Sequence, residues 1–302
     1  MFSQEKYDKI KKGCDKVNGG FLIVDKPKGY TSRDIVNMIG RFLNTQKVGH
    51  GGTLDPIATG VLVVAVGDGL KILQFMKGDT KEYIATAKLG ILTDTLDVTG
   101  NILKKVDNYF LDSVKLHDAI DSFKGKYLQE VPLYSSVKVG GKRLYSYARE
   151  NKEVILPKRE VEIFEIELLD VNHDEFAFRA LVSKGTYIRS LIRDIGDKIK
   201  IPCTMSNLKR TKQANFTIED TINLDDIEKG NFKFVPIDKV LSKYHTVVVD
   251  DNLERKILNG SILKNSYEDD IVVFKNSKGN VIAIYELYNK DESKIKPIKV
   301  FK

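Results

Sequence analysis

The chain has 302 residues, of which 42% are hydrophobic and 30% are charged, and its formal net charge is +7 with a sequence pI of about 9.0. These proportions are typical of a globular protein and exclude a disordered chain. The longest apolar run, residues 61–66, is far shorter than the ~18 residues that suggest a membrane span. At this length we expect one large domain and one small one. The basic balance is compatible with a nucleic-acid partner, although on its own it is weak evidence.

Cysteines and histidines are few: the chain has two cysteines and four histidines. Cys14 and Cys203 are far apart and lack a CxxC partner, which favours a reducing, cytoplasmic setting. No two histidines are spaced i, i+4 or lie near a cysteine, so the sequence predicts no zinc site. The first 18 residues are charged and lack an apolar segment, so we expect no signal peptide.

The apolar patterning predicts strands and helices in irregular order. After a strand at residues 21–24, Thr31 and Asp34 are spaced as the capping box of a helix that places Ile35 and Ile39 on one face. Further strands are predicted at residues 61–66, 83–89, 161–168 and 176–182, and further helices at 111–123 and 188–199. Because the two types do not alternate regularly, we expect an α+β fold with a mixed, largely antiparallel sheet and flanking helices.

A second unit is predicted after a boundary near residues 236–244. Its expected strands lie at residues 247–249, 271–274, 281–285 and 298–301, with a hairpin loop at Asn276–Asn280. These short strands indicate a compact, β-rich C-terminal unit.

The most informative segment is Gly49–Pro56, in which three glycines lie within four residues. It is no P-loop, since no Gly-Lys-Ser/Thr follows, and no dinucleotide fingerprint, since Leu54 stands where the third glycine belongs. What remains is a loop with one carboxylate, Asp55, which Pro56 biases toward extended geometry. Taken alone, an Asp-Pro pair more often organises a simple turn.

Two other segments carry polar groups in suggestive places. Ser183–Arg189 lies between a predicted strand and a helix, so Tyr187 and Arg189 are expected near the helix N-terminus. By itself this segment favours a capped helix whose arginine is solvated. For Asp94 and Asp97 we expect a role in organising a turn, not in catalysis.

Together these segments resemble the bacterial tRNA pseudouridine-55 synthase family of the TruB type, in which the number counts tRNA nucleotides. The resemblance runs from Asn18 to Phe301, with the motifs in family order. The matching segments are Lys26–Ser32, Gly49–Gly60, Lys81–Tyr83, Thr93–Gly100, Val131–Ser135, Gly141–Tyr145, Ser183–Arg189 and Leu208–Arg210. One departure is visible, because Gly51 stands where many members carry Thr or Ser.

The resemblance implies roles for six residues. Asp55 matches the catalytic aspartate, and Arg189 matches the arginine that pairs with it. The other four match residues that contact the RNA substrate: His50 beside the target, Tyr83 stacked on the flipped uracil, and Tyr187 and Leu208 lining the uridine pocket.

The implied reaction breaks the bond between ribose C1′ and uracil N1 and joins C1′ to C5. It involves no redox change and no loss of a group, so we expect neither an organic cofactor nor a metal. A carboxylate can attack the sugar or the base, or stabilise a cationic sugar, and the sequence does not decide whether Asp55 attacks C6 or C1′. The freed base must be held in a pocket with little water, or hydrolysis would follow.

The resemblance also implies a domain organisation and a partner. We expect an N-terminal extension at residues 1–17, a catalytic domain at 18–240 with an RNA-gripping insertion at about 131–158, and a PUA-like RNA-binding domain at 245–302. The expected partner is the T-stem-loop of tRNA, and the expected state is a cytoplasmic monomer. Two alternatives remain open: a guide-RNA-dependent pseudouridine synthase, and a tRNA-binding or folding factor without catalysis.

The insertion carries four basic residues that are candidates for phosphate contacts, and a solvated helix face is the competing interpretation. These candidates are Lys138, Lys142, Arg143 and Arg149.

Overall fold

A computed structural model describes residues 19–76 and 80–301 of the chain, so the expected N-terminal extension at residues 1–17 lies outside the described residues. The main sheet contains β1 (Gly19–Lys26), β2 (Val48–His50), β3 (Thr59–Gly67), β4 (Lys81–Leu89), β7 (Gly125–Glu130), β10 (Lys158–Val171), β11 (Glu175–Val182), β12 (Cys203–Gln213) and β13 (Phe216–Thr217). Its central order is β1-β3-β12-β4-β11-β10-β7, with β2 beside β3 and β13 beside β12. Only β12 and β3 pair in parallel among these strands. The α+β class with a mixed, largely antiparallel sheet is therefore confirmed.

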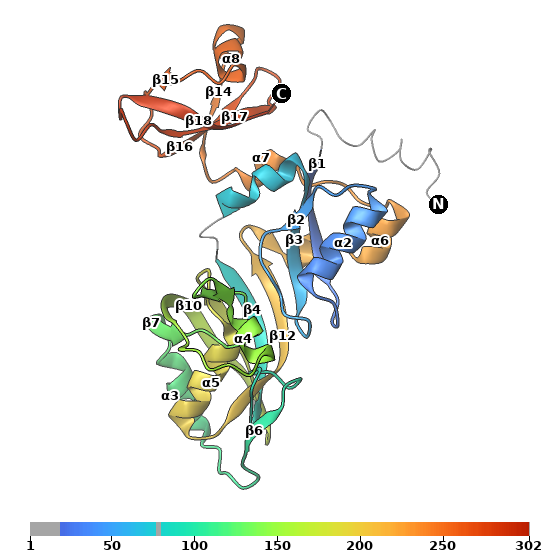
Figure 1. Cartoon of the computed structure of the whole chain (residues 1–302), viewed down its shortest axis with the longest axis vertical. Helices are drawn as coiled ribbons and strands as arrows, with labels where there is room; N and C mark the ends of the chain where they lie inside the picture. Colours follow the sequence, from blue (N-terminus) through green and yellow to red (C-terminus); the bar gives the residue numbers. More distant parts are fainter. Residues whose placement is uncertain (1–18, 77–79, 302) are drawn as a thin grey trace.

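Helices cover one face of this sheet. They are α2 (Ser32–Phe42), α3 (Ser113–Asp121), α5 (Ile188–Ile199) and α6 (Leu224–Lys229), whereas α4 (Leu144–Arg149) lies in the segment between β7 and β10. In Figure 1, α2 and α6 lie against the half that contains β1 and β3, whereas α3 and α5 lie against the half that contains β7 and β10. The predicted stripe on α5 is buried, with Leu191, Ile192 and Ile195 in the same core cluster as Phe176 and Phe178 of β11.

The strands β1 and β3 are buried on both faces, which explains their uninterrupted apolar sequences. Leu22 and Val24 face the helices, whereas Phe21 and Ile23 face a second core cluster. That second cluster includes α7 (Ile237–Val240) and apolar residues near the C-terminus. By contrast, β11 alternates between buried and half-exposed residues, because the other face of the sheet is open to solvent there.

The central strand β12 was not predicted. Its sequence contains Lys209, Arg210 and Lys212, and these polar residues mask the period-2 pattern. Its register shifts twice along β4, which breaks the alternation further. Two two-stranded sheets complete this part of the chain: β5 (Ile91–Thr93) with β6 (Ile102–Lys105), and β8 (Lys138–Val139) with β9 (Lys142–Arg143).

The C-terminal part has its own five-stranded sheet in the order β14-β16-β17-β18-β15. Its strands are β14 (His245–Val248), β15 (Leu263–Lys264), β16 (Ile271–Lys275), β17 (Val281–Leu287) and β18 (Lys294–Val300), and α8 (Asp251–Leu258) packs against them. The predicted hairpin loop closes with a hydrogen bond of 3.0 Å from the Asn276 N–H to the Asn280 carbonyl. The helix α8 was not predicted, although Asp250 caps it through the Leu253 N–H.

Within residues 19–76 and 80–301, no helix is both long and apolar enough to cross a membrane. In the same ranges, no three His, Cys, Asp or Glu side chains are grouped so that they could hold a metal ion.

Candidate active site

Asp55 lies on the loop that joins β2 to β3, and its side chain is 32% exposed. The glycine-rich segment is shorter as a loop than expected, because His50 ends β2 and Thr59 begins β3. The Asp55 carbonyl accepts the Ala58 N–H at 3.0 Å, which forms a tight turn after the carboxylate. The turn and the strands on either side therefore fix the direction of the Asp55 backbone.

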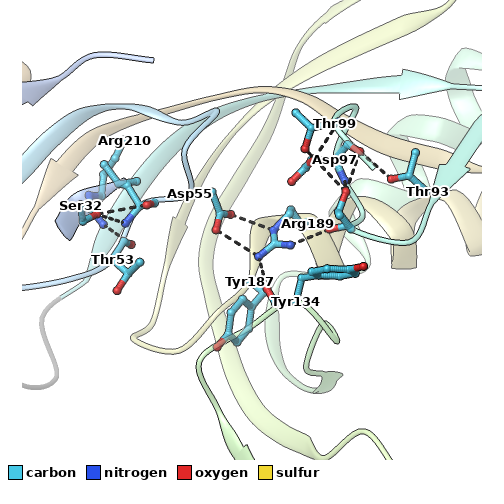
Figure 2. A network of polar contacts seen from close by, with 12 residues as sticks. Ser32, Thr53, Asp55, Thr93, Asp97, Thr99, Tyr134, Tyr187, Arg189 and Arg210 are labelled. Atoms are coloured by element: carbon cyan, nitrogen blue, oxygen red, sulfur yellow. Dashed lines mark hydrogen bonds and ion pairs between the residues drawn. The ribbon is translucent and has the colours of Figure 1, made fainter. Parts of the chain in front are cut away.

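Three buried polar side chains hold the main chain of this loop. Arg210 donates to the carbonyls of Gly52, Thr53 and Val61, at 3.2, 3.4 and 2.6 Å. The Ser32 hydroxyl accepts the Leu54 N–H at 2.8 Å and donates to the Leu54 carbonyl at 3.2 Å. Figure 2 shows Ser32, Thr53 and Arg210 beside Asp55. Since buried backbone groups are costly to leave unpaired, these contacts restrict the loop to one conformation.

The third side chain is Lys26, whose ammonium group donates to the carbonyls of Pro27, Tyr30 and Pro56 at 2.9, 2.7 and 3.4 Å. Burial lowers the pKa of Lys26 to about 8, and the negative charge of Asp55 opposes that shift. The cation therefore fixes the residue that follows Asp55 and also adds positive charge near the carboxylate.

Arg189 forms a two-pronged ion pair with Asp55. Its Nε lies 2.9 Å from Asp55 Oδ2, and its Nη2 donates to Asp55 Oδ1 at 3.2 Å. The remaining donors go to the carbonyls of Thr95, at 2.7 Å, and Tyr134, at 3.0 Å (Figure 2). The Arg189 side chain is 6% exposed, so the guanidinium supports the carboxylate from the protein interior and leaves its outer side open.

The turn that presents the Thr95 carbonyl is organised by Asp97, as expected. Asp97 Oδ1 accepts the Thr99 N–H and the Thr95 hydroxyl, each at 3.0 Å, and the Thr93 hydroxyl donates to the Asp97 carbonyl at 2.7 Å. Asp94 closes the other end of the turn by accepting the Asn101 N–H at 2.8 Å. Both aspartates therefore shape the turn whose Thr95 carbonyl accepts a hydrogen bond from Arg189.

Tyr187 is the N-cap residue of α5, and its main chain is held by Gln129 of β7. The Gln129 side-chain oxygen accepts the Tyr187 N–H at 2.8 Å, and its nitrogen donates to the Tyr187 carbonyl at 3.1 Å. Gln129 is fully buried. This side chain thus fixes the start of the helix two residues before Arg189, a role that no sequence pattern indicated.

Tyr83 and Leu208 lie on adjacent strands, β4 and β12, in the cluster that also contains Leu54 of the catalytic loop. They are 6% and 5% exposed. Burial lowers the pKa of Arg210, and a hydrogen bond with the Tyr83 side chain opposes that shift. Tyr83 is therefore linked to the arginine that holds the loop.

His50 is the last residue of β2, at the start of the loop, and is half-buried. Burial is the main cause that lowers the pKa of His50, and the positive charge of Arg210 lowers it further. The lowered pKa of His50 favours the neutral imidazole at pH 7. A neutral ring can enter a gap in RNA without bringing a charge into it.

The insertion at residues 131–158 contains β8, β9 and α4. Of its four basic candidates, Lys142 forms an ion pair with Glu150, whereas Arg143 and Arg149 lie over the ring of Tyr145 and Lys138 is exposed. An open cavity of about 740 Å³ is lined by Asp94 and by residues 133, 134, 148 and 151–156 of the insertion. The cavity therefore adjoins the site through Tyr134, whose carbonyl accepts a hydrogen bond from Arg189.

Comparison with known sequences identifies the family. The model of the TruB family pseudouridylate synthase (N terminal domain) matches residues 40–188. A curated relative from Clostridium tetani, called tRNA pseudouridine synthase B, is 41% identical over 88% of this chain and 92% of its own length. The chain belongs to the TruB family of pseudouridine synthases. It is therefore an RNA-modifying isomerase. Another TruB relative, from Oceanobacillus iheyensis, is 41% identical over 93% of this chain and 97% of its own length.

Solved structures share the TruB fold. The chain superposes on a chain of a Cbf5-Nop10-Gar1 complex with a TM-score of 0.72, at 25% identity and over 97% of this chain and 87% of that one. It also superposes on a chain of an H/ACA RNP bound to a substrate RNA containing 2′-deoxyuridine, with a TM-score of 0.71 at 24% identity, over 95% and 86%. The likeness therefore includes the nine-stranded and the five-stranded sheet.

Proposed function

We propose that this TruB-family protein converts the uridine at position 55 in the tRNA T-loop to pseudouridine, with Asp55 as the nucleophile. The observation that carries the proposal is the ion pair between Asp55 and the buried Arg189, on a loop that Arg210, Ser32 and Lys26 hold in place. A single carboxylate, partly open to solvent and backed by a fixed cation, is suited to covalent attack on a nucleoside. The relatives named tRNA pseudouridine synthase B support tRNA as the substrate.

In the proposed reaction, the Asp55 carboxylate reacts with C1′ or with C6, and the N1–C1′ bond breaks. The base turns within the pocket, a C5–C1′ bond forms, and the bond between Asp55 and C1′ or C6 breaks, which releases the carboxylate. C5 loses a proton and N1 gains one, so substrate and product are isomers. Arg189 keeps its positive charge throughout, as guanidinium groups do in proteins. Its two contacts hold the Asp55 carboxylate in a fixed orientation when the bound RNA excludes water.

The remaining site residues would hold the flipped nucleotide. Extracting a base from a folded loop costs a few kcal/mol, and stacking on one aromatic ring returns about 1–3 kcal/mol. Tyr83 would supply that stacking, Tyr187 and Leu208 would line the pocket, and the neutral His50 would contact the RNA beside the target. Phosphate contacts must supply the rest of the cost.

The partner follows from this mechanism. We propose that the T-stem-loop of tRNA binds over Asp55, between the insertion at residues 131–158 and a PUA-like RNA-binding domain at residues 245–302. The protein would act as a monomer in the cytoplasm.

The fold shared with chains of H/ACA complexes favours the guide-dependent alternative. Sequence identity favours the stand-alone enzyme, since it is 41% with tRNA pseudouridine synthase B and 24–25% with those chains. A non-catalytic tRNA-binding factor would have no need for a carboxylate paired with a buried arginine.

The test is to incubate the purified protein with an unmodified tRNA transcript, without guide RNA or other proteins, and to map pseudouridine at single-nucleotide resolution. We expect modification at position 55 of the T-loop. Modification that requires an added guide RNA and helper proteins would favour the guide-dependent alternative, and binding without modification under both conditions would favour the folding factor.

A further inference from the structure

A second polar groove, called here the α2 groove, lies along α2 and the turn that leads into β2. Its volume is about 720 Å³. The polar side chains that line it are Arg33, Asn37, Arg41, Asn44, Thr45 and Gln46. Among the residues that the structure describes, no acidic one lines it. The groove is therefore positively charged and rich in amide groups, which suits an anionic ligand.

The two arginines are available to such a ligand. In the part of the chain that the structure describes, neither the Arg33 nor the Arg41 side chain has an ion-pair or hydrogen-bond partner, and both residues are exposed. The one carboxylate on α2, Asp34, is engaged by Thr31 in the capping box. Two guanidinium groups are thus left free to bind phosphate, for which their planar geometry is well suited.

The spacing along the helix matches an extended ligand. Arg33, Asn37 and Arg41 are four residues apart and therefore lie on one face of α2. Each interval of four residues advances about 6 Å along a helix, which is comparable to the step between neighbouring phosphates of an RNA strand. The two cations are too far apart to enclose one small anion, but they can contact separate phosphates of one strand.

The rim of the groove has a defined structure. The Thr45 N–H donates to the Gly40 carbonyl at 2.9 Å, and the Lys47 N–H donates to the Thr45 hydroxyl at 3.2 Å. A Cβ atom at Gly40 would lie 2.9 Å from the Thr45 carbonyl oxygen, so only glycine allows the turn to approach α2 this closely. The shape of the groove is therefore fixed by contacts within the protein.

The α2 groove leads away from the candidate active site. The residue before Arg33 is Ser32, which holds Leu54 of the catalytic loop, and Val48 at the other end of the groove begins the strand that ends at His50. The positive charge of Arg33 also contributes to the lowered pKa of His50. Figure 1 shows α2 alongside β2 and β3. An RNA strand that leaves the active site past His50 thus has a direct path along the groove.

We propose that the α2 groove binds the phosphate backbone of the RNA strand that flanks the target uridine, with Arg33 and Arg41 each contacting a phosphate. The inference rests on the proposed function, because it takes the nucleotide at Asp55 as its starting point. It adds a binding site outside the catalytic loop and outside the insertion at residues 131–158.

The experiment measures the affinity of a T-stem-loop RNA as a function of salt, for the wild type and for Arg33→Gln/Arg41→Gln. Each phosphate contact on single-stranded nucleic acid contributes about 0.7 to the slope of log K against log salt. The double variant should therefore lower the slope by about 1.4 and weaken binding at least about tenfold at low salt. The matched control is Lys115→Gln/Lys124→Gln, which removes two exposed charges on and just after α3, on the opposite side of the molecule (Figure 1), and should change the slope little.

Phosphate-ethylation interference on the same RNA locates the contacts. In the wild type, ethylation of phosphates next to the target should weaken binding, and the double variant should lose this effect at about two positions only. An unchanged slope, or a lower slope without a local change in interference, would overturn the inference. Neither measurement requires turnover, so failure of the proposed isomerisation would be seen separately, in the pseudouridine assay.

Discussion

Replacing Arg189 with lysine keeps the positive charge beside Asp55 and removes the forked geometry. The guanidinium makes four contacts of 2.7–3.2 Å, two with Asp55 and one each with the carbonyls of Thr95 and Tyr134. A lysine ammonium is a single compact charge at the end of a flexible chain. It can therefore contact the carboxylate or the two carbonyls, but not both. If two charged hydrogen bonds are lost at about 1.5 kcal/mol each, the free energy of unfolding falls by about 3 kcal/mol.

The rate should fall as well, because a displacement of about 1 Å at the reacting group can cost about 100-fold. We therefore expect Arg189→Lys to lower the single-turnover rate of pseudouridine formation at least about 100-fold, and urea unfolding to report the loss of stability. The matched control is Arg193→Lys, one turn further along α5, where the arginine pairs with Glu130 at 2.9 Å and has no contact with Asp55. A variant Arg189→Lys with the wild-type rate would refute the claim that the fork positions the carboxylate.

Three further substitutions test the supports of the site. Ser32→Ala removes both hydrogen bonds to Leu54 and should lower the free energy of unfolding in urea by about 1–3 kcal/mol. An unchanged unfolding midpoint would mean that the loop keeps its conformation without these hydrogen bonds. Gln129→Leu leaves the Tyr187 main chain unpaired and should slow the single-turnover rate about tenfold at saturating RNA; an effect on stability alone would assign Gln129 a purely structural role. The pKa of Lys26 is lowered to about 8 in the folded protein, so between pH 8 and 10.5 the unfolded chain holds more protons and this residue makes stability rise with pH. Lys26→Met should remove that rise, and identical pH profiles of the unfolding midpoint would contradict it.

The sequence predicted those parts of the fold whose patterns are local. The capping box of Thr31 and Asp34 and the apolar stripe of α5 depend on residues within one or two turns, and both are present in the structure. The long strand β12 was missed because its pairing with β4 and β3 is long-range and its buried positions include Thr204 and Arg210. A fully buried arginine is tolerated there only because distant carbonyls accept its hydrogen bonds, which no local pattern reveals.

The same division applies to the site. Motif resemblance drew attention to Asp55 and Arg189, which the structure brings to within 2.9 Å of each other across 134 positions of sequence. The parts that hold them were not predicted, since the acceptors on Thr95 and Tyr134 are backbone carbonyls, which every residue carries. The role of Gln129 was not predicted for a related reason. The sequence around a glutamine in a strand does not indicate that its amide pairs with the main chain of Tyr187, 58 residues away.

The most direct test of the central claim is the single-turnover modification of a T-stem-loop transcript by Asp55→Asn. The substitution retains the shape of the side chain and removes its charge, so the loop contacts of Arg210 and Ser32 should remain. We predict that the wild type converts the T-loop uridine and that Asp55→Asn forms no detectable pseudouridine while still binding the RNA. Pseudouridine formation by Asp55→Asn at the wild-type rate would contradict the assignment of Asp55 as the nucleophile.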